Sequence, residues 1–164
     1  MNIPTRSIAA GLLVVGLTAV ILTKARAGGD DYFPPVADKL TADECGSCHM
    51  AFPPAMLPAA SWRRMMSELG DHFGDDASVD DATAARITRY LVDNAADSGG
   101  RRFGRKLMRG VAADASPQRI TELPKWIQEH DEVPRSEWKH NDVGSKANCP
   151  ACHTDANRGY FEDD

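Results

Sequence analysis

The apolar positions of the chain follow the spacing of helices rather than that of strands. The clearest stripe occupies one face of a predicted helix and consists of Ala84, Ile87, Tyr90, Leu91 and Ala95. Residues 78–81 (Ser-Val-Asp-Asp), just before this stripe, resemble a capping box at a helix start. No stretch alternates persuasively between apolar and polar residues, so the pattern predicts a mostly α-helical fold.

Three further segments are predicted to be helical, and they cover residues 38–49, 62–69 and 124–130. Ser61 is a plausible N-cap of the second segment, and Gly70 is a plausible stop. Pro53, Pro54 and Pro58 break the chain between the first two segments, which predicts a loop there. The helix pattern is therefore dense before residue 98 and sparse after it.

Residues 1–27 have the layout of a secretory signal peptide. Arg6 precedes the uncharged apolar run Ile8–Leu22, and Ala25-Arg26-Ala27 follows it as a small-residue cleavage signature. A run of 15 residues is short for a membrane span, which needs about 20. Lys24 and Arg26 lie after the run, where cleavable signals usually avoid positive charge, so an uncleaved membrane anchor is the alternative. Both interpretations place the folded part outside the cytoplasm.

Length and charge narrow the class of protein. The chain has 164 residues, of which 42% are hydrophobic, and this suits one domain or two very small ones sharing a core. The net charge of −5 becomes −8 without residues 1–27, because that segment holds three basic and no acidic residues. An acidic chain does not favour a nucleic-acid partner. It favours a partner with a basic docking surface.

All four cysteines belong to two copies of the pattern C-x-x-C-H. The copies are Cys45-Gly-Ser-Cys48-His49 and Cys149-Pro-Ala-Cys152-His153. This pattern is typical of the covalent attachment of haem c. Positions i, i+3 and i+4 share one face of a helical turn, so both thiols reach one porphyrin edge while the histidine reaches the iron. The sequence therefore predicts two covalently bound haem c groups per chain.

Other uses of the cysteines fit the sequence less well. A zinc ribbon needs roughly 15–20 residues between its two cysteine pairs, whereas 100 residues separate Cys48 from Cys149. A thioredoxin-like site needs a βαβ context, which is not found here. Structural disulfides are usual in exported proteins, but they leave the histidine after each pair unexplained.

Each haem iron needs a further axial ligand or stays open to an external one. Three histidines remain for this role: His72, His130 and His140. His72 follows the predicted helix 62–69 on a loop that can reach the first haem. His130 and His140 both lie within reach of the second haem, and position alone barely separates them. Methionine can also fill an axial position, and the methionines after residue 27 are Met50, Met56, Met65, Met66 and Met108. Met65 and Met66 lie within a predicted helix, where methionines at such spacing are more often core residues.

The pattern divides the chain into a signal peptide (1–27), an N-terminal cytochrome c-like haem domain (28–97), a connector (98–117) and a C-terminal haem segment with little secondary structure (118–164). The connector carries a basic cluster without an acid, which suits either a solvated face or pairing with haem propionates or with acids of a partner. This cluster consists of Arg101, Arg102, Arg105, Lys106 and Arg109. In the C-terminal segment, Trp126 and Ile127 share a helix face with His130 and are expected to pack on the haem ring or on the first unit.

The chain resembles the bacterial dihaem cytochrome c family called DHC. The N-terminal match covers Glu44–His49, Pro53-Pro54, Leu57-Pro58, Ser61-Trp62, Met65-Met66, Leu69 and His72–Ala77. The C-terminal match covers Ile120–Glu122, Trp126, His130, Val143–Ser145, Ala147–Cys149, Cys152-His153, Ala156 and Gly159. The resemblance implies bis-histidine ligation, with His49 and His72 at haem 1 and His153 and His130 at haem 2, and it ranks His140 second.

These features predict an electron carrier that relays single electrons between redox partners, and not an enzyme. An iron with both axial positions filled has no place for a substrate, so no substrate pocket is expected. The alternatives are a small peroxidase-like dihaem enzyme or a haem-based ligand-binding sensor, each with one open iron. The resemblance further implies exchange with a small monohaem oxygen-binding cytochrome or with a membrane b-type cytochrome.

Overall fold

The computed structural model describes residues 32–98 and 104–162, so the predicted signal peptide lies outside the described residues. The α-helices are α1 (Lys39–Cys45), α2 (Ala59–Ser67), α3 (Asp81–Asp93) and α4 (Pro124–Glu129). Short 3₁₀ helices cover Pro54–Met56, Leu69–Asp71, Ile120–Glu122, Glu137–Lys139, Cys149–Ala151 and Ala156–Arg158. Within the described ranges, extended pairing is limited to two isolated bridges, Tyr32 with Tyr160 and His72 with Asp75. The predicted mostly α-helical fold is confirmed.

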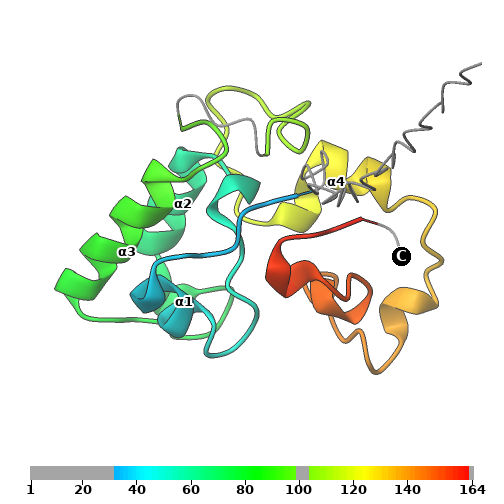
Figure 1. Cartoon of the computed structure of the whole chain (residues 1–164), viewed down its shortest axis with the longest axis horizontal. Coiled ribbons are helices and arrows are strands. Elements are labelled where there is room, and N and C mark those ends of the chain that lie inside the picture. The colour runs from blue at the N-terminus through cyan, green and yellow to red at the C-terminus, as the bar shows by residue number, and fades with distance from the viewer. Residues whose placement is uncertain (1–31, 99–103, 163–164) are drawn as a thin grey trace, which may run out of the picture.

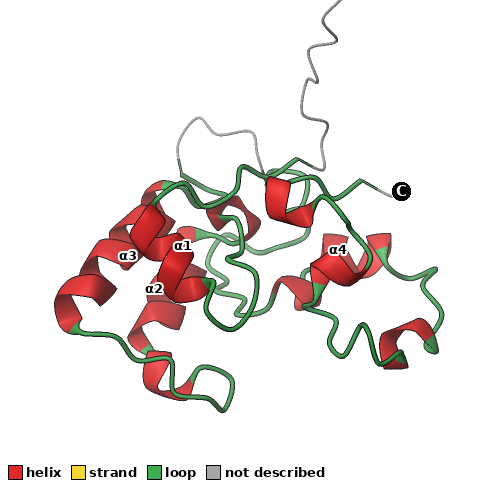
Figure 2. Cartoon of the chain, turned by 60° about the horizontal axis from the view of Figure 1, so that its bottom comes forward, coloured by secondary structure: helices red, strands yellow, loops and turns green. Residues whose placement is uncertain are grey.

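Helices α1, α2 and α3 lie together on one side of the molecule, and α4 lies on the other side with the C-terminal segment (Figure 1). Loops and single 3₁₀ turns make up most of that second side (Figure 2). The low content of secondary structure after residue 118 therefore agrees with the sequence prediction. The two sides share one hydrophobic cluster, in which Leu107, Leu123 and Trp126 join residues of the helical side.

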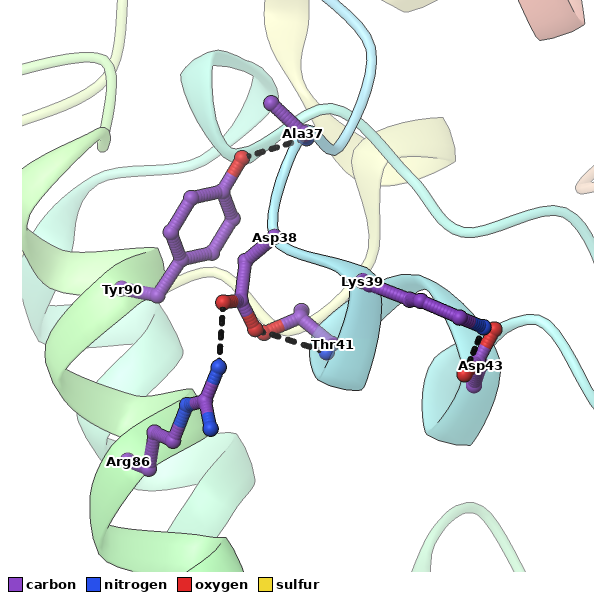
Figure 3. Close-up of polar contacts among 7 residues, drawn as sticks. All are labelled: Ala37, Asp38, Lys39, Thr41, Asp43, Arg86 and Tyr90. Atoms are coloured by element: carbon purple, nitrogen blue, oxygen red, sulfur yellow. Dashed lines mark hydrogen bonds and ion pairs between the residues drawn. The ribbon is translucent and has the colours of Figure 1, made fainter.

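Helix α1 begins at a side-chain cap that also connects it to α3 (Figure 3). Asp38 accepts hydrogen bonds from the Thr41 backbone N–H and from its hydroxyl, both at 3.0 Å. The Arg86 guanidinium of α3 lies 2.9 Å from the second carboxylate oxygen of Asp38. The Thr41 N–H, followed by Arg86, holds the pKa of Asp38 below its ordinary value. One carboxylate thus fixes both the start of α1 and its contact with α3.

The helix boundaries differ from the prediction in ways that have physical causes. Helix α1 ends at Cys45 rather than at His49. Helix α3 is capped by Asp80, whose carboxylate accepts from the N–H groups of Ala82 and Thr83 at 3.0 Å each. The capping box beginning at Ser78 was therefore wrong, because Asp80 lies one residue before the helix and reaches its free N–H groups.

Helix α2 begins at Ala59 rather than at Trp62, and it ends at Ser67. Pro58 precedes it in an extended conformation, and the first turn already closes behind this residue, since Ser61 N–H bonds to the Pro58 carbonyl at 3.0 Å. Ser61 is therefore a fully buried residue inside the helix, and its predicted role as the N-cap was wrong. Its neighbour Trp62 is also buried and donates its indole N–H to the Pro54 carbonyl at 2.8 Å.

The two ends of the described chain meet beside the second cysteine motif. The Phe33 N–H donates to the Gly159 carbonyl at 2.8 Å. The Tyr32 and Tyr160 rings lie 4.9 Å apart, and the Phe33 and Phe161 rings lie 5.7 Å apart, edge to face. Gly159 adopts a φ of +87°, and a Cβ there would overlap the Phe33 carbonyl oxygen. A glycine is needed at position 159, both for its backbone conformation and for the close approach of the two chain segments.

Candidate haem sites

The first C-x-x-C-H motif begins on the last residue of α1. Cys45 is partly buried, and this burial raises the pKa of its thiol, whereas Cys48 is exposed. The next residue, Gly46, closes the helix with its N–H on the Ala42 carbonyl at 2.9 Å. His49 follows in an exposed turn, and its Nδ1 lies 2.7 Å from the Met50 carbonyl oxygen. A proton on Nδ1 satisfies that carbonyl and leaves Nε2 free to bind a metal.

His72 comes from a different loop, and the structure brings it next to His49. Their ring centroids lie 6.2 Å apart, and the ring planes differ by only 23°. The backbone of His72 is tied to Asp75 in both directions, with N–H···O distances of 2.8 and 3.3 Å. Phe73 follows with a φ of 59°, which makes it the one non-glycine residue with positive φ in the described ranges. Burial lowers the pKa of His72, which favours the neutral imidazole that a metal requires.

The second C-x-x-C-H motif lies on a 3₁₀ turn near the C-terminus. Burial raises the pKa of the Cys149 thiol to about 11. The His153 N–H donates to the Cys149 carbonyl at 2.8 Å, which closes one turn over the motif. The His153 ring lies 5.8 Å from Phe161, and its Nδ1 lies 3.4 Å from the Glu162 carbonyl oxygen. Phe161 and Glu162 thus contact the His153 ring and help to fix its position.

His130 is the histidine that lies beside His153. It caps the C-terminus of α4, and its Nδ1 lies 2.8 Å from the Trp126 carbonyl oxygen. The centroids of the His130 and His153 rings lie 6.1 Å apart, and their planes cross at 78°. Trp126 stacks on His130 at 4.0 Å and 14°. His140 is 63% exposed and has its Nδ1 3.4 Å from the Asp142 carboxylate.

The residues at both places fit a haem. Two metal–imidazole bonds of about 2 Å each, with roughly 1 Å more from each nitrogen to its ring centre, place two ring centroids about 6 Å apart. The observed separations of 6.2 and 6.1 Å leave room for one iron in each pair. None of the four cysteines is in a disulfide. Cys45 and Cys149 are partly buried, and burial raises the pKa of both thiols, so these two positions suit uncharged thioethers better than thiolates.

The remaining candidate ligands lie apart from one another or in the core. Within the described ranges, no three or more His, Cys, Asp or Glu side chains gather as a group that could hold a metal ion. Met65 and Met66 pack against the hydrophobic cluster, as their spacing predicted. Met56 belongs to the cluster, and Met108 also packs against it. Met50 lines a small cavity of about 170 Å³ with Pro35, Val36 and Ala156, among others.

Other predicted contacts have mixed outcomes. Trp126 packs in the hydrophobic cluster with residues of the first unit, as expected, but Ile127 is 53% exposed. The stacking of Trp126 on His130 had not been predicted. Within the basic cluster, Arg101 and Arg102 lie outside the described residues, and Lys106 pairs with Glu129 of α4 at 3.0 Å. That pairing is with an acid of this chain, which neither interpretation of the cluster had named.

Sequence reasoning missed two groups around the histidines. Arg119 lies 3.9 Å from the centre of the Phe73 ring, beside His72. Phe161 and Glu162 hold His153 from the C-terminus. An aromatic residue directly after a predicted ligand, as in His72-Phe73, is the one signal in the sequence that could have drawn attention to the first group.

Two motifs for haem attachment, each with a second histidine facing its own, define a c-type cytochrome with two haem sites. The family model for dihaem cytochrome c (DHC) matches residues 41–161, and the chain belongs to this family. It therefore carries two covalently attached haem c groups, as the sequence predicted. A comparison with curated proteins gives no match.

Solved structures of dihaem cytochromes resemble this chain closely. A diheme cytochrome c from Rhodobacter sphaeroides is 47% identical, with a TM-score of 0.72, and the match covers 78% of this chain and 99% of that one. A second structure, of DHC purified from the same organism, is 45% identical with a TM-score of 0.66, covering 77% and 99%. A diheme cytochrome from Shewanella baltica OS155 is 40% identical with a TM-score of 0.61, covering 76% and 86%.

Proposed function

We propose that this protein is a periplasmic dihaem cytochrome c that relays single electrons between redox partners through two bis-histidine haems. The observation that carries the proposal is the pairing of histidines at nearly equal separations, 6.2 Å for His49 with His72 and 6.1 Å for His130 with His153. A haem iron supplies one-electron exchange between its ferric and ferrous states.

The residues of the chain have separate tasks in this scheme. Cys45 and Cys48 hold haem 1, and Cys149 and Cys152 hold haem 2, through thioethers. Three of the four histidines have Nδ1 near a backbone carbonyl, namely those of Met50, Trp126 and Glu162. Such bonds fix the tautomer and the ring direction, and they strengthen the ligand. Histidine on both sides favours a lower reduction potential than histidine with methionine.

External ligands provide the direct test. With both axial positions filled by histidine, neither cyanide added to the ferric protein nor carbon monoxide added to the ferrous protein is expected to change the spectrum rapidly. Rapid binding to the resting protein would instead indicate an open iron, and therefore a peroxidase-like enzyme or a sensor. Magnetic circular dichroism of the ferric protein reports the same coordination independently.

Export is supported by the leader-like residues 1–27 and by the haem c itself, because c-type cytochromes are typically exported. None of the helices within residues 32–98 and 104–162 has the length and hydropathy of a membrane span. Mass spectrometry of the protein isolated from its host is expected to give a chain that starts at Gly28 and carries two haem additions. A mass that retains residues 1–27 would support a membrane anchor.

For partners we propose a small monohaem oxygen-binding cytochrome or a membrane b-type cytochrome with a basic docking surface. The charge of −8 that remains without residues 1–27 supports attraction to such a surface. Mixing the ferrous protein with each ferric candidate in a stopped-flow spectrometer measures the transfer directly. The rate is expected to fall as salt is added, and a rate without salt dependence would argue against docking by charge.

A further inference from the structure

The two histidine pairs match in separation but differ in orientation. His49 and His72 have nearly parallel rings, at 23°, whereas His130 and His153 have crossed rings, at 78°. The chain is thus built to present two different ligand arrangements to two chemically identical groups. Because the haems are the same, any electronic difference between them must come from the protein.

Contacts of the His130 ring explain why its plane is held. The Trp126 indole lies almost parallel to it, at 4.0 Å and 14°, and the carbonyl of the same residue accepts from Nδ1 at 2.8 Å. Trp126 is itself only 7% exposed and belongs to the hydrophobic cluster. Trp138 packs against Trp126 at 5.8 Å, and the Lys146 ammonium lies over both indoles at 5.7 and 5.4 Å. Because the Trp126 indole is buried and held in place by its neighbours, the His130 imidazole has one favourable orientation, parallel to that indole.

Ring planes matter because an imidazole donates π electrons perpendicular to its own plane. Two iron d orbitals can accept these π electrons. Two parallel rings donate into the same one of the two orbitals and so separate the two orbitals in energy. Two crossed rings donate into both orbitals, so these remain close in energy. The first arrangement gives a ferric low-spin iron a rhombic magnetic signal with three resolved features, and the second gives one feature at low field.

We propose that Trp126 is a positioning residue, which holds His130 across His153 and so gives haem 2 a different electronic ground state from haem 1. The inference rests on the proposed bis-histidine ligation, and it gives a cause for the different electronic ground states of the two haems. Trp126 touches the ligand and acts on the iron only through it.

The first test is the electron paramagnetic resonance spectrum of the fully oxidised wild-type protein. It is expected to contain one rhombic low-spin signal and one single low-field feature, in equal amounts. The variant His72→Met assigns them, because it alters haem 1 alone and should change only the rhombic signal. Two rhombic signals in the wild type would overturn the proposal.

The second test compares matched variants within one aromatic cluster. Trp126→Leu removes the stacked indole but keeps the backbone carbonyl, so the low-field feature is expected to broaden and to move toward a rhombic shape. Trp138→Leu is the control, because Trp138 lies farther from His130, at 6.0 Å and 40°, and does not stack. A low-field feature that is unchanged in Trp126→Leu, or that moves equally in both variants, would contradict the role of Trp126.

Conservative variants keep the test decisive if the leucine at position 126 prevents folding. Trp126→Phe retains a smaller ring and is expected to shift the feature by less than leucine does. Trp138→Phe is expected to shift it by less still, because Trp138 does not stack on His130. Equal spectra for the two phenylalanine variants would overturn the proposal. Failure of the bis-histidine assignment has a different signature, since an open iron gives a high-spin signal and binds carbon monoxide in the wild type.

Discussion

The crossing of the two chain ends at Gly159 gives a quantitative prediction. In the variant Gly159→Ala, the added methyl group would overlap the Phe33 carbonyl oxygen and would lie 3.0 Å from Cδ of Pro35. Both neighbours are backbone or proline ring atoms, which cannot rotate away as the end of a flexible side chain can. The segment that contains Phe33 therefore has to move off the C-terminal segment.

Three contributions set how much Gly159→Ala lowers the free energy of unfolding. An alanine at φ +87° has the left-handed conformation, which costs roughly 1–2 kcal/mol. The Phe33 N–H loses its bond to Gly159, worth about 0.5–1.5 kcal/mol. Phe33 is 6% exposed, and its release from the core costs about 1.5–3 kcal/mol. Together these put the loss in the free energy of unfolding at roughly 3–6 kcal/mol.

Gly144→Ala is the matched control, because Gly144 also has a positive φ, of +64°, but has no atom within 4 Å of an added Cβ. Its expected loss is only the conformational cost, roughly 1–2 kcal/mol. Urea unfolding of both holoproteins, followed by far-ultraviolet circular dichroism, measures the difference. Equal losses in the two variants would show that the close approach to Phe33 adds nothing to stability, and the reasoning would be refuted.

Three further predictions concern the ligands and the cap of α1. After reduction, His130→Ala is expected to bind carbon monoxide at one haem, whereas His140→Ala is not; binding by the His140 variant alone would reverse the assignment. His72→Met should keep both haems attached while the potential of one haem rises, because a thioether sulfur is a weaker donor; a redox titration identical to that of the wild type would remove His72 from the ligands. Hydrogen bonding from Thr41 and the pairing with Arg86 depress the pKa of Asp38 below 3.8, so the stabilisation by Asp38 is present above about pH 3.8 and is lost as pH falls through its lower folded pKa. Asp38→Asn should therefore unfold at lower urea than the wild type at neutral pH, and this gap should close in strong acid; a gap that stays constant with pH would contradict the role of the charge.

Many residues of the candidate haem sites could be predicted from the sequence, because haem attachment needs a fixed local spacing of cysteines and histidine. The cysteines and histidines of both motifs could be named from five consecutive residues each, whereas the family assignment rests on a match over residues 41–161. The predicted ligands His72 and His130 were harder to find, because they lie outside the motifs. The resemblance favoured His130 over His140, and so did the predicted helix with Trp126 and Ile127 that His130 ends. In the structure His130 ends α4 and stacks on Trp126, whereas His140 lies exposed beside Asp142.

Helix existence was easier to predict than helix ends. The stripe of α3 places Ile87 and Leu91 in the core as expected, but two caps were assigned to the wrong residue. Serine and aspartate both cap helices, so the pattern around residues 78–81 allowed more than one start. The contact between Phe33 and Gly159 had no local signal at all, because it joins residues that are far apart in the sequence.

That contact also has a consequence for the order in which the protein can be completed during synthesis. Contacts among α1, α2 and α3 become available once the first part of the chain has emerged, and such local units can form early. The partner of Phe33, in contrast, lies 126 residues farther along the chain, so this contact forms later in synthesis than the contacts among the three helices. Phe33 therefore has no Gly159 to bond to until that segment has been made, and the surroundings of His153 are completed only then.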